Sequence, residues 1–216
     1  MSIRIDNVDV YGFEASIRGM RSPKNSWDKS DSRWSSPDEN GTDEPMYIIG
    51  ENDLKLMKTL AAAGQDHGKF LRMIHVQLDV TAPLYWWKEA DTYSVGVVKN
   101  SCSTMHKIHA KEFTLDDFSH EHLYSPMHDL KPTVDLLNVY RERFLDTKDK
   151  EDWWQLIQLL PSSYNQRRTW DLNYAVLRNI YHARKGHRLD EWKTLLDWIE
   201  TLPYAKELIC GVGKNL

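Results

Sequence analysis

TWDLNYAVLRNIYHARKGHRLDEW, residues 169–192, is the stretch on which the interpretation of this chain depends. Apolar side chains recur through it at helical spacing and predict a helix over residues 168–185. Asn173 and Arg184 are eleven residues apart. That separation is about three helical turns and places the two within roughly 20° of each other around the helix axis. Two polar groups on one line of a largely apolar helix indicate a polar partner, the alternative being two solvated side chains.

The flanking sequence predicts the other elements. A strand is expected in residues 3–13, and a second in residues 74–81, where apolar and polar side chains alternate strictly. Helices are predicted over residues 15–23, 51–64, 83–93, 132–145, 150–160 and 188–202. Residues 22–45 are rich in Ser, Asp, Asn and Pro and are expected to form a long polar loop. Few strands followed by several helices indicate a single α+β domain over residues 1–216.

The composition is typical of a globular protein, with 41% hydrophobic and 28% charged residues and nine Trp. The formal net charge of -4 disfavours binding to a nucleic-acid backbone, which requires a basic surface, although a few arginines can hold a nucleotide. Because Cys102 and Cys210 are the only cysteines, no disulfide framework is expected and a cytoplasmic location is the simplest expectation. Neither a signal peptide nor an apolar run of about 18 residues is recognisable, so no membrane segment is expected.

A cluster of histidines is the first candidate for chemistry. His106 and His109 would share one face of a helix, and His120 and His122 would share one face of a strand. Four converging imidazoles could bind zinc, iron or manganese in a metal-dependent hydrolase. Neither an HExxH motif nor a cysteine pair accompanies them, so this metal site is the weaker alternative.

Arginine side chains are the second candidate. The chain has no GxGxxG and no GxxxxGK[ST] motif, so the glycine loops that hold nucleotide phosphates are absent from the sequence. Five arginines lie in or near the stretch quoted above: Arg167, Arg168, Arg178, Arg184 and Arg188. Their planar, paired donors suit phosphates and pyrimidine carbonyls, whereas the simpler alternative is a solvated basic helix face.

The C-terminal part of the chain also carries a spaced motif: LLP at 159–161, LNYAVLRNIYHAR at 172–184 and EW at 191–192. This pattern resembles the flavin-dependent thymidylate synthases, in which LP precedes a helix of pattern N-A-R-x-L-x-N-x-x-x-x-R and an H-A-Q-W-E segment. The matching positions are Asn173, Leu177, Asn179 and Arg184 in spacing, and His187 and Trp192 in type, with one residue inserted before the Trp. Ala175 stands where the family has Arg.

The N-terminal half is similar to this family in outline. Residues 61–64 (AAAG), 73–80 (MIHVQLDV) and 81–87 (TAPLYWW) resemble the family's helix end, its strand, and the Ala-Pro that opens its next helix. After Ala-Pro the family carries R-Q-x-x-R-H-R, which binds the flavin and the substrate phosphate. Here Thr92, Tyr93 and Ser94 occupy the R-H-R positions. The cations that could replace those groups are Lys69, Arg72, Lys88 and Lys99.

The resemblance implies a small, mostly antiparallel sheet packed with several helices, and active sites formed between the subunits of a homotetramer. It implies FAD as cofactor, dUMP or a related pyrimidine nucleotide as substrate, and a folate as one-carbon donor. The cofactors would then carry the hydride and methylene chemistry. A phage-encoded relative of the family is the source that such divergence suggests.

The resemblance also implies roles for individual residues. Arg184 would bind and polarise the pyrimidine as the catalytic residue, and Arg178 and Arg188 would be further substrate-binding groups. The flavin pocket would be lined by Asn173, Asn179 and His187. The alternative on the same fold is a nucleotide-binding or interaction protein without flavin, since function depends on the site rather than on the fold.

Overall fold

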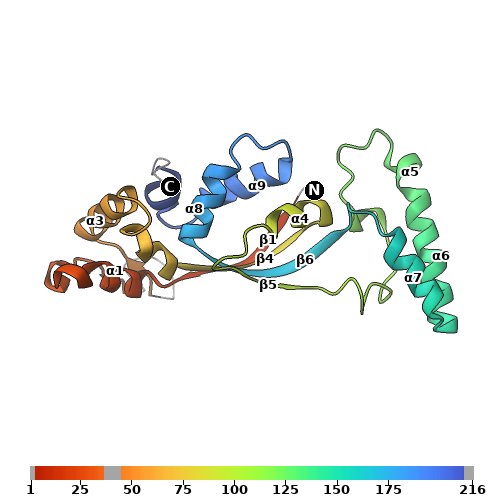
Figure 1. Ribbon diagram of the computed structural model, residues 1–216, viewed down its shortest axis with the longest axis horizontal. Helices are drawn as coiled ribbons and strands as arrows, with labels where there is room; N and C mark the ends of the chain where they lie inside the picture. The colour runs from red at the N-terminus through yellow and green to blue at the C-terminus, as the bar shows by residue number, and fades with distance from the viewer. Residues whose placement is uncertain (1–2, 37–44, 212–216) are drawn as a thin grey trace.

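Four antiparallel strands form one sheet at the centre of the molecule, in the order β1-β4-β6-β5 (Figure 1). The strands are β1 (Arg4–Tyr11), β4 (His75–Pro83), β5 (Val98–Ser101) and β6 (Asn165–Asn173). This computed structural model describes residues 3–36 and 45–211. The expected α+β fold with a small antiparallel sheet is confirmed, as are the strands predicted in 3–13 and 74–81.

The alternation of β4 produces a sheet with one buried face. Val76, Leu78 and Val80 are at most 1% exposed, whereas Gln77 between them is exposed. Leu78 lies opposite Trp170 of β6, which is fully buried. Period-two patterning therefore sets the face against which the helices pack.

Three helices cover this face, and the others lie at the two ends of the sheet (Figure 1). The covering helices are α4 (Leu84–Ala90), α8 (Tyr174–Ala183) and α9 (Asp190–Ile199). At one end lie α1 (Phe13–Arg21) and α3 (Glu51–Ala62), and at the other α5 (Pro126–Asp129), α6 (Lys131–Thr147) and α7 (Lys150–Leu159). Short 3-10 turns span Ser22–Lys24, Trp27–Lys29, Gly68–Met73 and Leu115–Asp117, and a π turn spans Lys206–Cys210. Within the described ranges, no helix is long and apolar enough to cross a membrane.

Tryptophans build the centre of the main core. Trp86, Trp87, Trp170 and Trp192 are fully buried, and the Trp86 ring lies 4.8 to 6.0 Å from the other three ring centroids. Edge-on and tilted contacts of this kind add to the burial of the rings. A second, smaller cluster packs under α6 and α7 and consists of Ile108, Phe113, Phe118, Leu130, Val134, Leu137 and Leu156.

The prediction of one helix over residues 168–185 is wrong in its first third. The chain is a strand up to Asn173, and only Tyr174–Ala183 is helical. Trp170 and Leu172 are buried two residues apart and pair with β4, so strand pairing overrides the helical spacing. Asn173 is the N-cap of α8, where its side-chain oxygen accepts from the Val176 amide at 3.1 Å, and Arg184 is the C-cap.

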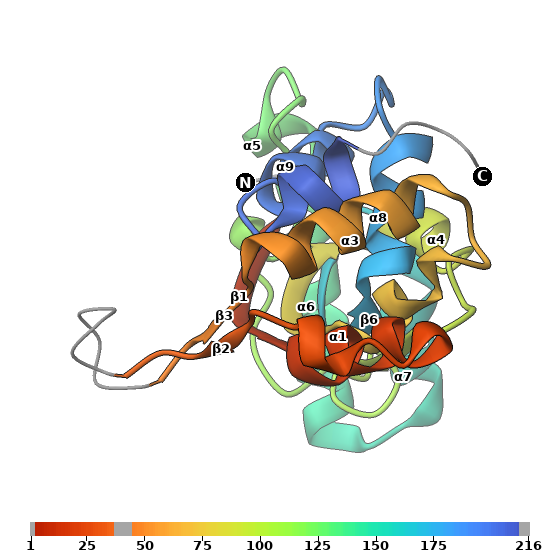
Figure 2. The same cartoon turned by 90° about the vertical axis from the view of Figure 1, so that its left-hand side faces the viewer.

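The predicted polar loop over residues 22–45 is also more structured than expected. Besides two 3-10 turns, it contains β2 (Arg33–Trp34), which pairs with β3 (Tyr47–Ile48) in an arm that projects from the body (Figure 2). The buried Asp53 carboxylate orders the base of this arm by accepting from Ser30 at 2.7 Å and from Ser32 at 2.6 Å. Residues 37–44 of the predicted loop lie outside the described part of the chain.

Candidate functional site

Side chains from α4, α9 and the segments that follow α4 and α8 converge around one carboxylate, and we call them the Glu89 cluster: Glu89, Tyr93, Arg184, His187 and Trp192. One oxygen, Oε2 of Glu89, lies 2.9 Å from Nη1 of Arg184, 3.1 Å from Nε2 of His187 and 3.1 Å from Nε1 of Trp192. Arg184 also donates to the Tyr93 hydroxyl at 2.9 Å, and its guanidinium lies 4.4 Å from the Trp192 ring centroid. The Arg184 charge is therefore neutralised and stacked within the chain itself.

The polar partner inferred from the alignment of Asn173 and Arg184 is the end of α4 together with the segment that follows it. Arg184 reaches Glu89 and Tyr93, and the Asn173 amide donates to the Gly96 carbonyl at 3.4 Å. Both caps of α8 thus contact residues 89–96, although one residue precedes the helix and the other follows it.

A cavity of about 460 Å³ lies alongside α8, between this helix, the 3-10 turn Gly68–Met73 and Gly96; we call it the α8 cavity. It is lined by Asn173, Asn179 and Arg178 together with the exposed Arg72. Arg178 is only 6% exposed and donates to the Ala61 carbonyl at 2.8 Å. Burial lowers the pKa of Arg178.

The residues predicted from the sequence therefore fall into two groups. Asn173, Asn179 and Arg178 line the α8 cavity, whereas Arg184 and His187 line a different cavity of about 300 Å³ between α8 and α9. Arg188 is exposed on the turn between these helices and lines neither cavity. The structure does not bring the three predicted substrate-binding arginines to one place.

The R-H-R positions and most of the proposed replacement cations contribute no positive charge to the α8 cavity. At the R-H-R positions, Thr92 donates to the Glu89 carbonyl at 2.7 Å and Tyr93 accepts from Arg184, so no cation is available there for a pyrophosphate. The Lys99 ammonium, one of the proposed replacements, is held by the Ala90 carbonyl at 2.9 Å and by the Asp91 carboxylate at 3.1 Å. Of the four replacements only Arg72 lines the cavity.

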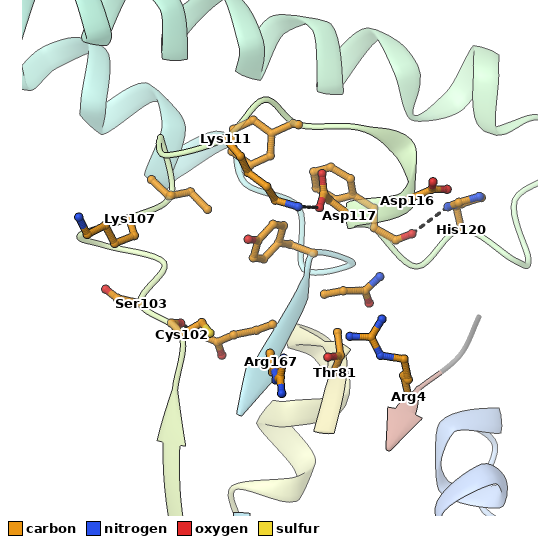
Figure 3. Close-up of a pocket in the computed structure, with 16 residues that line it drawn as sticks. Arg4, Thr81, Cys102, Ser103, Lys107, Lys111, Asp116, Asp117, His120 and Arg167 are labelled. Atoms are coloured by element: carbon orange, nitrogen blue, oxygen red, sulfur yellow. Dashed lines mark hydrogen bonds and ion pairs between the residues drawn. The ribbon is translucent and has the colours of Figure 1, made fainter. Parts of the chain in front are cut away.

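A separate cavity of about 680 Å³ lies where the strands end against the second core cluster (Figure 3). We call it the sheet-end cavity, and its lining includes four cationic side chains, Arg4, Lys107, Lys111 and Arg167, but only two carboxylates, Asp116 and Asp117. Lys111 is paired with Asp117. Arg167 is paired with Asp79 at 2.6 Å and Arg4 with Asp6 at 2.7 Å, both carboxylates outside the lining. Carboxylates therefore neutralise three of the four cations, and among the described residues Lys107 is the cation of this lining that has no ion pair.

Two buried polar atoms of this lining have no hydrogen-bond partner among the described residues: Oγ1 of Thr81 and Oδ1 of Asn165. Buried polar atoms are nearly always paired, so each is a candidate to bind an ordered water or a ligand. Tyr164 also lines the cavity, and burial raises the pKa of its hydroxyl. Sequence reasoning singled out Arg167 but missed Arg4, Thr81 and Asn165, which come from three different strands.

The four histidines do not form a metal centre. In the described part of the chain, no three side chains of metal-ligand type come together. His109 packs on Phe144 with ring centroids 4.8 Å apart, His120 contacts the Phe118 carbonyl at 2.8 Å, and His122 contacts Asp190 at 3.1 Å. The expected convergence is wrong because residues 106–122 form turns rather than the helix and strand that would align these side chains.

Two solved structures similar to this chain are crystal structures of the flavin-dependent thymidylate synthase ThyX from Helicobacter pylori with FAD and dUMP. The first has a TM-score of 0.65, and the match covers 99% of this chain and 100% of the ThyX chain. The second has a TM-score of 0.70, and the match covers 100% of each chain. Sequence identity is 14% in each. No protein-family model matches the chain, and no curated protein matches its sequence. The chain therefore has the fold expected from its C-terminal motif, at low sequence identity.

Proposed function

We propose that this protein, which has the fold of the flavin-dependent thymidylate synthases, binds a pyrimidine nucleotide in the sheet-end cavity without using flavin. The observation that carries the proposal is the combination, in one cavity of about 680 Å³, of four cationic side chains and two buried polar atoms that have no partner among the described residues. Cavities of this size accommodate small-molecule ligands. The similar ThyX structures contain dUMP, a nucleotide of the proposed class.

Each part of a nucleotide has a complementary group in this cavity. Arg4 and Lys107 would donate to the phosphate, since charge-assisted bonds to phosphate are strong. After rotation of the two side chains into the cavity, Oδ1 of Asn165 would accept from the N3–H of uracil and the Thr81 hydroxyl would donate to a carbonyl of the base. We expect uracil to be preferred over cytosine, because N3 of cytosine is an acceptor and would face the Asn165 oxygen.

Calorimetric titration of the protein with dUMP and dCMP tests this proposal. The substitution Arg4→Gln removes a phosphate donor and should weaken dUMP binding roughly ten-fold, and Thr81→Val should weaken it a few-fold at unchanged shape. Lys58→Gln, an exposed charge change on α3, is the matched control and should bind like the parent. Equal affinity of Arg4→Gln and the parent for dUMP would exclude the sheet-end cavity as the nucleotide site.

Flavin-dependent methylation of dUMP is the second candidate, favoured by the presence of Asn173 and Asn179 in one cavity. In this case Arg184 would leave Glu89 to polarise the pyrimidine, with Arg178 and Arg188 as substrate groups, His187 at the edge of the flavin pocket and a folate as one-carbon donor. Because the family builds its sites between subunits, a homotetramer would be required. An absorbance spectrum after incubation with FAD tests this candidate: a bound flavin lost in Asn179→Ala supports it, and a colourless protein that takes up no FAD excludes it.

A further inference from the structure

A small pocket lies beside the α6–α7 turn. Its volume is about 360 Å³, and it lies between residues 105–109 and the start of α7. Its apolar surface is provided by Met105, Phe144 and Trp153, and its polar surface by His106, His109, Lys148 and Lys150. We call it the His109 pocket. Its lining shares no residue with the sheet-end cavity.

Positive charge surrounds His109 without compensation from the pocket lining. Burial lowers the pKa of His109, and the charges of Lys148, Lys107 and Arg141 lower it further. The charges that act on the imidazole are therefore all cationic: Lys107 on its own segment, Arg141 on α6 and Lys148 at the C-cap of α6. The lining adds Lys150 on α7 and contains no carboxylate.

The imidazole itself is held in place but incompletely bonded. Its ring packs edge-on against Phe144, with 4.8 Å between centroids, and Arg141 fixes the backbone by donating to the His109 carbonyl at 3.0 Å. Nδ1 of His109 is buried and has no hydrogen-bond partner among the described residues. An anion in the pocket would favour the protonated imidazole and neutralise the cations around it.

We propose that the His109 pocket binds a phosphomonoester whose phosphate lies between His109, Lys148 and Lys150. A phosphate offers three oxygens in a tetrahedral arrangement, which suits donors that arrive from separate elements. The indole N–H of Trp153 is already bonded to the Met105 carbonyl at 3.0 Å, so its ring is left for packing. The apolar side therefore matches a ligand with a ring or short apolar body rather than a free phosphate ion.

Proton NMR of the His109 imidazole at constant ionic strength tests the proposal. Phenyl phosphate should raise the pKa of His109 in a saturable way, inorganic phosphate should do so only at roughly ten-fold higher concentration, and benzyl alcohol should have no effect. In a separate series, added sodium chloride alone should not reproduce this shift of the His109 pKa. If it did, charge screening would explain the shift and the proposal would be overturned. Absence of any saturable shift with phenyl phosphate would also overturn it.

Two variants locate the phosphate. Lys148 has a φ of +57°, so Lys148→Gly removes the charge at a position whose backbone favours glycine, and the helix end is retained. This change and Lys150→Gln should each weaken phenyl phosphate binding roughly ten-fold, whereas Lys58→Gln should leave it unchanged. Unaltered binding in both variants would place the ligand elsewhere. Arg4→Gln, which addresses the sheet-end cavity, should not change the His109 response, so the two proposals fail or succeed separately.

Discussion

Replacing Glu89 by Gln measures how firmly Arg184 is held within the chain. The side chain of Glu89 is 37% exposed and that of Arg184 18% exposed, with 2.9 Å between the bonded atoms. Unit charges about 4 Å apart attract by about 4 kcal/mol at an effective dielectric constant near 20. Exposure to solvent screens this attraction, and the entropy lost when the two side chains are held in one geometry offsets much of the remainder. Exposed pairs contribute about 0–1 kcal/mol and breaking fully buried ones costs about 3–5 kcal/mol. For this intermediate case we expect a loss of about 1–2 kcal/mol.

Urea and thermal unfolding of the Glu89→Gln, Arg184→Gln and double variants form the assay. A loss of about 1–2 kcal/mol corresponds to a Tm lower by roughly 3–6 °C in a chain of this length. The double-mutant cycle should return a coupling of about 1 kcal/mol, because the two side chains share one ion pair. A coupling near zero together with an unchanged Tm would refute the view that Glu89 neutralises Arg184. It would leave Arg184 available for a ligand, as the flavin-dependent candidate requires.

Four further predictions concern other parts of the molecule. The substitution Asp53→Asn should lower the free energy of unfolding in urea by about 3–5 kcal/mol. The buried Arg21, whose Nε lies 2.6 Å from an Asp53 oxygen, would lose its carboxylate partner. Burial alone would raise the pKa of Asp53, but hydrogen bonds hold this pKa below its ordinary value. The ionised Asp53 therefore stabilises the fold above about pH 4, and this contribution should be lost as the pH falls through the lower folded pKa. Urea midpoints measured across this pH range test the prediction. Gly12→Ala should lower Tm in a circular-dichroism melt, because Gly12 has a φ of +97° and a Cβ would lie 2.1 Å from the Met73 carbonyl oxygen. In peptide-mapped labelling with an aromatic disulfide, Cys102 should react roughly ten-fold faster than Cys210, since Cys102 is exposed whereas burial raises the pKa of the Cys210 thiol; equal rates would contradict this.

Local patterns in the sequence were sufficient for the elements whose burial is periodic. The strict alternation of residues 74–81 predicted β4, and apolar spacing predicted helices at the positions of α3, α6, α7 and α9. The C-terminal motif indicated the fold, which the similar structures confirm. Such predictions succeed because the period of the apolar side chains is fixed by the geometry of a strand or a helix.

The sequence by itself therefore determined the α+β class, most of the helices, two strands of the main sheet, and the expectation of a polar partner for Asn173 and Arg184. Only the tertiary structure decided that residues 165–173 form a strand, because their pairing with β4 outweighs local preference. It also placed Glu89 against Arg184, 95 positions away, and separated the four clustered histidines. The physical reason is the same in each case: contacts between residues distant in sequence depend on sheet register and helix packing, and no local pattern encodes them.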